Sequence, residues 1–370
     1  MNIRFDFKNE PLIFSHPVSI ITCASFKEVA SSFERMEEAL ARGLYLAGYF
    51  SYELGYAFEE KFSSYALDGF PLIHVGCYQT PQPRDPKRFS ADSAAEINNV
   101  RFNLSKDIYS RHIEVIRSYL QAGDVYQITY CLKILFDFKG DASVLYKKLF
   151  DAQPVGYAAY IETESHSIAS LSPELFLYKK GSRILSKPMK GTWPRGKNIL
   201  SDFAARYQFR RDEKNRAENI MITDLLRNDL SRIGKNIHVP RLCEITAYKM
   251  LYQMTSTVAA DIDPDVSLYH LWKSLFPSGS VTGAPKIRAM EIIHELESEP
   301  RHIYTGAIGY IKPNKDLFMN IPIRTALIHR VKGKGEMGIG GGIVWDSTAE
   351  GEWEEGLLKA KFFTDFCLKT

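Results

Sequence analysis

Apolar residues recur at helical spacing in one segment shortly after residue 104. Ser105 is a suitable N-cap for this segment, and Gly123 is a suitable stop. The residues that share its apolar face are Ile113, Ile116 and Leu120. This pattern predicts a helix between Ser105 and Gly123.

Elsewhere, short runs of β-branched and aromatic residues bounded by turn signals predict strands. These runs lie at residues 125–136, 156–163, 172–180, 182–192, 303–312, 317–330 and 337–345. Helical periodicity predicts further helices at 213–233, 285–297 and 348–363. Pro285 suits the first position of its helix. Runs of strands with helices between them indicate an α+β fold with a large, mostly antiparallel sheet system.

One break divides the chain. Residues 80–99 (TPQPRDPKRFSADSAAEINN) are rich in Pro, Ser, Ala and Asn. They form either a linker or a long surface loop between a shorter N-terminal part and a longer remainder.

Composition narrows the function classes. Apolar residues make up 45% and charged residues 25% of the chain, and the net charge is only +3, so neither nucleic acid nor a membrane is an expected partner. The first residues resemble neither a signal nor a transit peptide, and no apolar run is long enough for a membrane helix. Five scattered cysteines indicate reduced thiols in a cytoplasmic protein: Cys23, Cys77, Cys131, Cys243 and Cys367.

Three glutamates are candidate metal ligands. Glu352 and Glu355 are three residues apart in the last predicted helix and therefore share a face. Glu218 lies in the middle of the helix at 213–233. Converging carboxylates suit Mg²⁺, but on spacing alone an exposed acidic face is the commoner explanation for Glu352 and Glu355.

Several other positions suit an anionic ligand. Arg324 lies in a predicted strand (NIPIRTALI) with few charged neighbours, where it either binds a carboxylate or faces solvent. The turn at 277–286 (PSGSVTGAPK) either offers backbone N–H groups to an anion or is purely structural. The glycines of 337–344 permit close approach of a ligand, or mark a bend.

Lys190 is a candidate nucleophile. It lies in KPMKGTWPRG, near Lys187 and Arg195. A lysine that is buried or near other cations can lose its proton and attack carbon, whereas a solvated turn lysine does not.

Taken together, these segments resemble the chorismate-utilising enzymes, which include the anthranilate, aminodeoxychorismate, isochorismate and salicylate synthases. The resemblance rests on AGDVYQITY, LSPELF, KPMKGTWPRG, RAENIMITDLLRNDL, FPSGSVTGAPKIRAMEIIHELE, YTGAIGYI, NIPIRTALI and GIGGGIVWDSTAEGEWEEGLLKA, in this order. LAGYFSYELGYAFE, at residues 46–59, resembles their N-terminal part. The resemblance implies two large sheets packed face to face with helices outside. It also implies an N-terminal part at 1–104 and a chorismate-binding catalytic domain at 105–370.

The resemblance also implies a role for each candidate residue. Glu218, Glu352 and Glu355 would surround Mg²⁺, which holds the ring carboxylate of chorismate. Glu174 would be the general acid that protonates the departing C4 hydroxyl. Arg324 and Tyr310 would hold the enolpyruvyl carboxylate, together with backbone N–H groups near Gly341. Thr282 and Lys359 would complete the pocket.

Two positions distinguish the members of this family. Members that add water to chorismate carry a lysine where this chain has Gln127. Anthranilate synthases resemble P-I-A-G-T, whereas this chain has Lys190 in PMKGT, as the aminodeoxychorismate synthases do. That lysine is expected to attack C2 of the ring before ammonia adds at C4, giving 4-amino-4-deoxychorismate. Gln253, where many members carry histidine, is harder to reconcile with anthranilate formation, which needs a proton abstraction.

The remaining expectations concern partners and alternatives. The chain has no G-x-C-x-G thiol and ends at Thr370, so a separate glutamine amidotransferase subunit is expected to supply the ammonia. The alternative enzyme is anthranilate synthase component I. The alternative of another class is a relative that binds chorismate without turnover.

Overall fold

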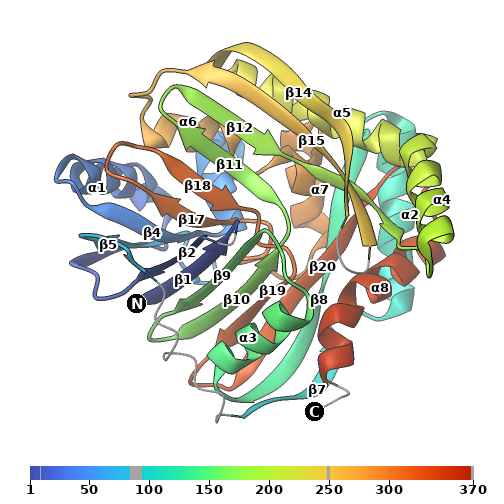
Figure 1. The fold of residues 1–370 in the computed structure, drawn as a ribbon, viewed down its shortest axis with the longest axis horizontal. Coiled ribbons are helices and arrows are strands. Elements are labelled where there is room, and N and C mark those ends of the chain that lie inside the picture. Colours follow the sequence, from blue (N-terminus) through green and yellow to red (C-terminus); the bar gives the residue numbers. More distant parts are fainter. Residues whose placement is uncertain (9, 84–93, 248–250, 368–370) are drawn as a thin grey trace.

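The computed structural model describes residues 1–8, 10–83, 94–247 and 251–367, with side chains described up to residue 364 (Figure 1). Its α-helices are α1 (Val29–Ala41), α2 (Lys106–Ala122), α3 (Ala142–Ala152), α4 (Ile199–Arg211), α5 (Glu213–Ser231), α6 (Leu268–Leu275), α7 (Lys286–Leu296) and α8 (Ala349–Cys367). Short 3-10 turns cover Phe26–Glu28, Tyr52–Phe58, Glu60–Phe62 and Gly279–Val281.

The strands form two ten-stranded sheets, and every described pairing is antiparallel. The first sheet runs in the order β16 (Gly283–Ala284), β8 (Gln127–Gly140), β20 (Lys334–Ile343), β19 (Thr325–His329), β10 (His166–Ser172), β9 (Tyr157–Glu162), β1 (Asn2–Phe7), β2 (Glu10–Phe14) and β6 (Gln82–Pro83), with β7 (Ala95–Phe102) beside β8. The second runs β13 (Met189–Pro194), β15 (Leu251–Ile262), β12 (Arg183–Lys187), β11 (Leu175–Lys180), β18 (Leu317–Asn320), β17 (Ala307–Ile311), β4 (Tyr45–Phe50), β5 (Ile73–Tyr78) and β3 (Ser19–Cys23), with β14 (Gly234–Ala247) beside β15.

The two sheets pack face to face. One buried cluster takes side chains from both sheets, such as Phe5 and Ile161 of the first and Tyr49 and Ile308 of the second. A second cluster joins the first sheet to α2, α3 and α7, and a third joins the second sheet to α1, α5 and α6. The predicted α+β fold, with face-to-face antiparallel sheets and helices outside, is therefore confirmed.

Both sheets include strands from the N-terminal part of the chain. β1 pairs with β9 in the first sheet, and β4 pairs with β17 in the second. The division at residue 104 stays a prediction, and the two sheets run across it. Half of the predicted break at 80–99 lies outside the described residues, which leave out 84–93.

Most of the predicted elements are present, with a few local differences. Ser105 caps α2 by accepting a hydrogen bond from Ile108 N, and Gly123 ends it at a φ of 78°. Pro285 is the N-cap of α7 and not its first helical residue. The run at 317–330 is two strands in different sheets, because the chain leaves β18 after Asn320 and enters β19 only at Thr325.

Figure 1 shows α2, α4 and α8 together at one side of the molecule, with α5 near α4. The sequence pattern did not predict α4. Among the described residues, no helix combines the length and the apolar character that a bilayer crossing requires. The four cysteines whose side chains are described are buried and free.

Candidate active site

A stripe of glycines on β20 forms the floor of the site. Gly338, Gly340 and Gly342 alternate along the strand and so point to one face. A Cβ on Gly342 would lie 2.6 Å from Gln127 Nε2 and 3.1 Å from Lys190 Nζ. Only glycine therefore leaves room for these two side chains to approach the strand.

Gln127 and Lys190 come from different sheets. Gln127 opens β8 and is fully buried, and neither polar atom of its side chain has a hydrogen-bond partner in the described part of the chain. Lys190 lies on β13 at the edge of the second sheet. The site thus lies between the two sheets, and Gln127 has two unused polar atoms for a ligand.

Lys190 is held where its amine is easily deprotonated. Burial lowers the pKa of its ammonium, and the nearby carboxylates of Glu218 and Glu174 partly oppose that shift. The next residue, Gly191, has a φ of 86°, and a Cβ there would lie 2.5 Å from Asn215 Oδ1. The tight contact between β13 and α5 therefore requires glycine at this position.

Glu174 immediately precedes β11 and is 3% exposed. Burial raises the pKa of its carboxyl group from 4.5 to about 7, while the Ser280 hydroxyl and the Lys190 ammonium act in the opposite direction. Ser280 Oγ donates to Glu174 Oε1 at 2.7 Å. The structure therefore brings the predicted acid and the predicted nucleophile together.

Two of the three predicted metal ligands approach β20 from α8 at Gly341, which lies between the last two glycines of the stripe. A Cβ on Gly341 would lie 3.1 Å from Glu352 Oε2 and 3.8 Å from Glu355 Oε1. Glu352 is 8% exposed and accepts a hydrogen bond from Ser347 Oγ at 2.6 Å. Burial raises its pKa, and the charge of Glu355 raises it further. Glu352 therefore does not belong to an outward acidic face, whereas the side chain of Glu355 beside it is 51% exposed.

Lys359 links α8 to β20. Its Nζ lies 2.7 Å from Glu355 Oε1 and donates to the carbonyl of Gly340 at 2.8 Å. That carbonyl belongs to the part of β20 that continues past its pairing with β19, which ends at Met337. Lys359 holds the pKa of Glu355 below its ordinary value.

Glu218 approaches the same region from α5. Burial raises the pKa of its carboxyl, and the charge of Glu355 does so as well, whereas Lys190 and Lys214 lower it. Lys214 also acts on Glu352 and Glu355. Within the described ranges, no group of three or more His, Cys, Asp and Glu side chains is arranged so that it could hold a metal ion. The predicted metal role of the three glutamates stays a prediction.

The turn at 277–286 uses its own backbone donors. Ser280 N donates to Ser278 Oγ, Val281 N to Ser278 O, and Thr282 N to Gly279 O. Thr282 is fully buried, and its hydroxyl donates to Ser278 O at 3.0 Å. Of the two interpretations of this segment, the structural turn fits better than an anion cradle. Ser280 connects this turn to the candidate active site, because its hydroxyl donates to Glu174.

Arg324 lies before β19 and not within a strand as predicted. Its backbone has a φ of 51°, because the chain turns from one sheet to the other at this point. Its Nη1 donates to Gln153 Oε1 at 3.4 Å, and its guanidinium carbon lies 6.0 Å from the ring centre of Phe362. Its predicted carboxylate contact stays a prediction.

Tyr310 is placed elsewhere. Its ring packs against Phe5, Phe7 and Phe14 in the core between the sheets, with centroid separations of 5.4, 6.2 and 6.0 Å. This position contradicts the prediction that Tyr310 holds a substrate carboxylate. The Tyr310 ring lies on β17 of the second sheet, whereas the glycine stripe lies on β20 of the first sheet.

Tyr304, six residues earlier in the same motif, is the tyrosine on the glycine stripe. A Cβ on Gly338 would overlap its ring. Thr305 N donates to Pro322 O at 3.2 Å, which places the Tyr304 segment beside the residues that lead to Arg324. Sequence reasoning missed Tyr304, Ser280 and Lys214. The alternating glycines were the available signal for Tyr304, since they mark where side chains approach the sheet.

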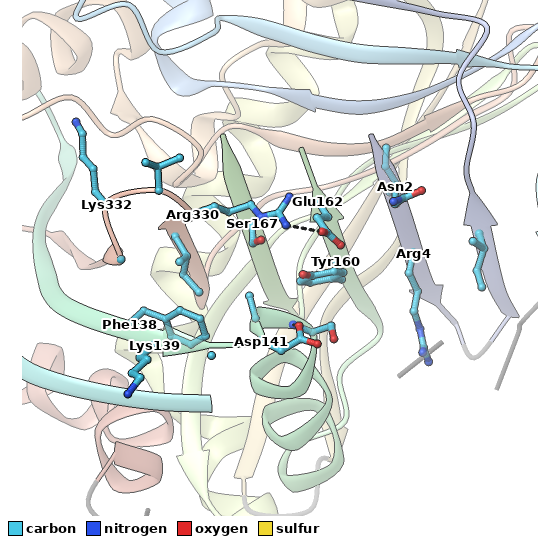
Figure 2. A pocket seen from close by; sticks show the side chains of 18 residues that line it. Asn2, Arg4, Phe138, Lys139, Asp141, Tyr160, Glu162, Ser167, Arg330 and Lys332 are labelled. Atoms are coloured by element: carbon cyan, nitrogen blue, oxygen red, sulfur yellow. Dashed lines mark hydrogen bonds and ion pairs between the residues drawn. The ribbon is translucent and has the colours of Figure 1, made fainter. Parts of the chain in front are cut away.

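A separate hollow of about 670 Å³ lies on the outer face of the first sheet. Figure 2 shows its lining, including the Arg330–Glu162 ion pair at 3.0 Å and the side chains of Lys139 and Lys332. None of the predicted site residues is among those that line it. The candidate active site and this hollow therefore lie in different parts of the molecule.

Comparison with known proteins agrees with the geometry. A probable chloroplastic aminodeoxychorismate synthase of Oryza sativa subsp. japonica is 42% identical over 277 residues, which cover 72% of this chain and 31% of that protein. Aminodeoxychorismate synthase component 1 of Bacillus subtilis is 36% identical over 259 residues, which cover 70% of this chain and 55% of that protein. The matched region thus spans 31% and 55% of the lengths of these two relatives.

Solved structures show the same fold. Anthranilate synthase component I from Streptococcus pneumoniae superimposes with a TM-score of 0.82 at 23% identity, over 97% of this chain and 91% of that one. The menaquinone-specific isochorismate synthase from Escherichia coli gives 0.78 at 14% identity, over 99% and 88%. The family model described as chorismate binding enzyme matches residues 8–365. This chain therefore belongs to the family of chorismate binding enzymes.

Proposed function

We propose that this protein converts chorismate and ammonia to 4-amino-4-deoxychorismate, with Lys190 as nucleophile and Glu174 as general acid. The observation that carries the proposal is the position of the Lys190 amine beside Gly342, where its charge interacts with the buried carboxyl group of Glu174. The names of the Oryza and Bacillus relatives support the same activity.

Charge balance supports a dianionic substrate accompanied by a cation. Three carboxylates (Glu218, Glu352, Glu355) face three ammonium groups (Lys190, Lys214, Lys359), so their formal charges cancel. Chorismate brings two more negative charges. Once Lys190 is neutral, as a nucleophile must be, the site carries an excess of negative charge that a divalent cation would offset.

The donor set fits Mg²⁺. This ion prefers oxygen ligands and usually takes only one or two protein carboxylates together with waters and an anionic ligand. Glu218, Glu352 and Glu355 would hold it, and when bound it would supply the positive charge that keeps a substrate carboxylate in place. Arg324 and Tyr304 are the candidates for the second carboxylate, because their segments lie side by side.

The covalent chemistry balances with these residues alone. The neutral amine of Lys190 forms a bond to C2 while both ring double bonds shift and the C4–O bond breaks. Glu174 gives its proton to the departing hydroxyl, which leaves as water, and then accepts the proton released by the new C2 ammonium. Ammonia next bonds to C4, both ring double bonds return to their original positions, and the lysine amine leaves C2 with a proton from the added nitrogen.

The test is chorismate with ammonium and Mg²⁺, with products resolved by chromatography. The proposal requires an amine at C4 and retention of the pyruvyl group. Anthranilate together with released pyruvate would replace this proposal by the anthranilate synthase reaction. Binding without product would indicate a non-catalytic relative.

Chelation should abolish turnover, and added Mg²⁺ should restore it, because the substrate carboxylate then loses its counter-charge. Glu355→Gln should weaken Mg²⁺ binding, measured by titration calorimetry with and without chorismate. Glu354→Gln is the matched control, since it removes the same charge one position along α8. Full activity in excess chelator would exclude a metal role.

Ser280→Ala should raise the pKa of Glu174, because the hydroxyl now stabilises the carboxylate form. The proton-donating form then persists to higher pH, so the alkaline fall in kcat should move upward. The plateau of kcat at lower pH should decrease modestly, because a weaker acid donates its proton less readily. The pH profile of kcat measures both effects. Ser231→Ala, a hydroxyl that bonds only to Asn228 O, should leave the profile unchanged. An unshifted profile for Ser280→Ala would show that the hydrogen bond is not functional.

A further inference from the structure

Helix α4 presents an apolar face to solvent. Phe209 is its one buried residue among those described. Ile199 is 88% exposed, Phe203 73% and Tyr207 49%. These three residues are four apart, so they form one stripe of about 12 Å along the helix, and Leu200 widens it. Contiguous exposed apolar surface of this kind marks an interaction site more often than a free surface.

The helix is firmly held in this orientation. Asp202, in its first turn, accepts hydrogen bonds from Arg195 Nε at 2.7 Å and from Tyr252 OH at 2.8 Å. Asn198 closes a capping box at its start. The ring of Phe209 stacks on Trp193 of β13. The exposed stripe is therefore a fixed feature of the surface and not the outcome of a frayed end.

A hollow of about 520 Å³ lies beside the stripe, between α4 and β14. Phe203 and Tyr207 line one side of it, and Leu242, which is 51% exposed, lines the other. Arg206 and Arg210 stand at the same hollow, and neither makes an ion pair with any described residue. We name Ile199, Leu200, Phe203, Arg206, Tyr207 and Arg210 the α4 face.

The α4 face is adjacent to the candidate active site. β13, which carries Lys190, leads directly into α4. Asp212 ends α4 and caps α5, whose Lys214 interacts with Glu352 and Glu355. A subunit docked on α4 would therefore lie next to the residues that the proposed reaction uses.

We propose that the α4 face is the docking surface for a separate, glutamine-hydrolysing amidotransferase subunit whose contacting surface is apolar and rimmed by carboxylates. The inference rests on the proposed function, because only a reaction that consumes ammonia needs such a partner. Aromatic residues and arginine are the types enriched at protein interfaces, and apolar residues surrounded by arginines call for an acidic rim on the partner. Delivery beside the site also shortens the path over which ammonia is lost to solvent.

A second copy of this chain is a poorer occupant. A two-fold contact places the same patch on both sides, so Arg206 and Arg210 would face their own equivalents. Nearby acids are already paired, Asp202 with Arg195 and Glu244 with Arg241. Like charges at the rim would oppose this contact, whereas a carboxylate-rich partner would be attracted.

The experiment compares wild type, Phe203→Asp, Arg210→Glu and the control Val331→Asp. Val331 is 85% exposed and lines the hollow of Figure 2, so the control places the same charge on a distant surface. Each protein is mixed with an amidotransferase subunit from the same organism, purified separately and shown to hydrolyse glutamine. Complex formation is measured by sedimentation velocity, and turnover is measured with ammonium and with glutamine.

Phe203→Asp and Arg210→Glu should weaken the complex by at least about tenfold and lower glutamine-dependent turnover in proportion. Their ammonium-dependent turnover should match wild type, and Val331→Asp should match wild type in every assay. Unchanged glutamine-dependent turnover in Phe203→Asp would overturn the proposal. Self-association of the wild type, or its binding to anionic phospholipid vesicles, would also overturn it if abolished by Phe203→Asp while the complex persists. Absence of ammonium-dependent product from the wild type would instead refute the proposed function, and sedimentation would still decide the docking surface.

Discussion

Replacing Lys190 by alanine is expected to slow amination of chorismate by more than about 10³-fold, or about 4 kcal/mol of transition-state stabilisation. The substitution removes the amine that forms the bond to C2, so any residual reaction requires direct attack of ammonia at C4. Binding of chorismate and Mg²⁺ should persist, because the carboxylates and Lys359 remain. Stopped-time assays of product, together with titration calorimetry of substrate binding, measure the two effects separately.

A covalent role predicts a further observation. Wild-type enzyme incubated with chorismate without ammonia should gain the mass of an adduct at Lys190, and Lys190→Ala should not. Lys187→Ala is the matched control, since Lys187 ends β12, which β15 separates from the β13 strand of Lys190, and its amine lies 3.8 Å from Glu244. A Lys190→Ala enzyme that aminates C4 at the wild-type rate would refute the nucleophilic role.

Glu174→Gln is expected to lower kcat by about 10²- to 10⁴-fold, the usual contribution of a positioned general acid. The amide keeps the shape and the hydrogen bond to Ser280 but has no proton to give. In the wild type the pKa of Glu174 is about 7, so its acid form prevails below that pH. The kcat of the wild type should therefore fall as pH rises through about 7, and this limb should be absent from Glu174→Gln.

Stability provides the control for this variant. The raised pKa means that the folded protein keeps the Glu174 proton between its ordinary pKa of 4.5 and about 7, where the unfolded chain has lost it. The contribution of this group to folding stability is therefore present at low pH and lost as pH rises through that window. Glu174→Gln removes the buried charge, so above pH 7 its melting temperature should equal or exceed that of wild type. A lower melting temperature would show that the loss of activity reflects unfolding.

The protonation states of Lys190 and Glu174 depend on one another. A buried ion pair of Lys190 with Glu174 carries a large desolvation cost, whereas a neutral amine beside a neutral acid does not. Burial lowers the pKa of Lys190 and raises that of Glu174, so both shifts favour the neutral pair. That pair is the reactive form, and its protons titrate as a coupled unit.

Local patterns were sufficient for elements that have one buried face and clear end signals. The helix from Ser105 to Gly123 and the mid-helix place of Glu218 follow from periodicity and capping, which act within a few residues. Helix α4 was missed for the opposite reason. It buries little but Phe209, so its sequence lacks the apolar stripe by which a core-facing helix is recognised.

The site shows the same division. Motif content identified Glu174, Lys190, Gln127 and the α8 glutamates, because each lies in a distinctive local sequence. The sequence analysis named Tyr310 and not Tyr304, because both occur in one motif and only the packing of the sheets decides which ring reaches the glycine stripe. Ser280 could not be recognised either, because its partner Glu174 is 106 residues away in the chain.

The sequence by itself determined the fold class, the family and most of the chemical groups, since periodicity, caps and turn residues act through neighbours along the chain. Only the tertiary structure decided which groups meet. Gln127 and Lys190 belong to different sheets, and their proximity exists because those sheets pack face to face over glycines that leave room for both. The pKa values of Lys190 and Glu174 likewise depend on burial and on charges contributed by distant segments, and no local pattern encodes either.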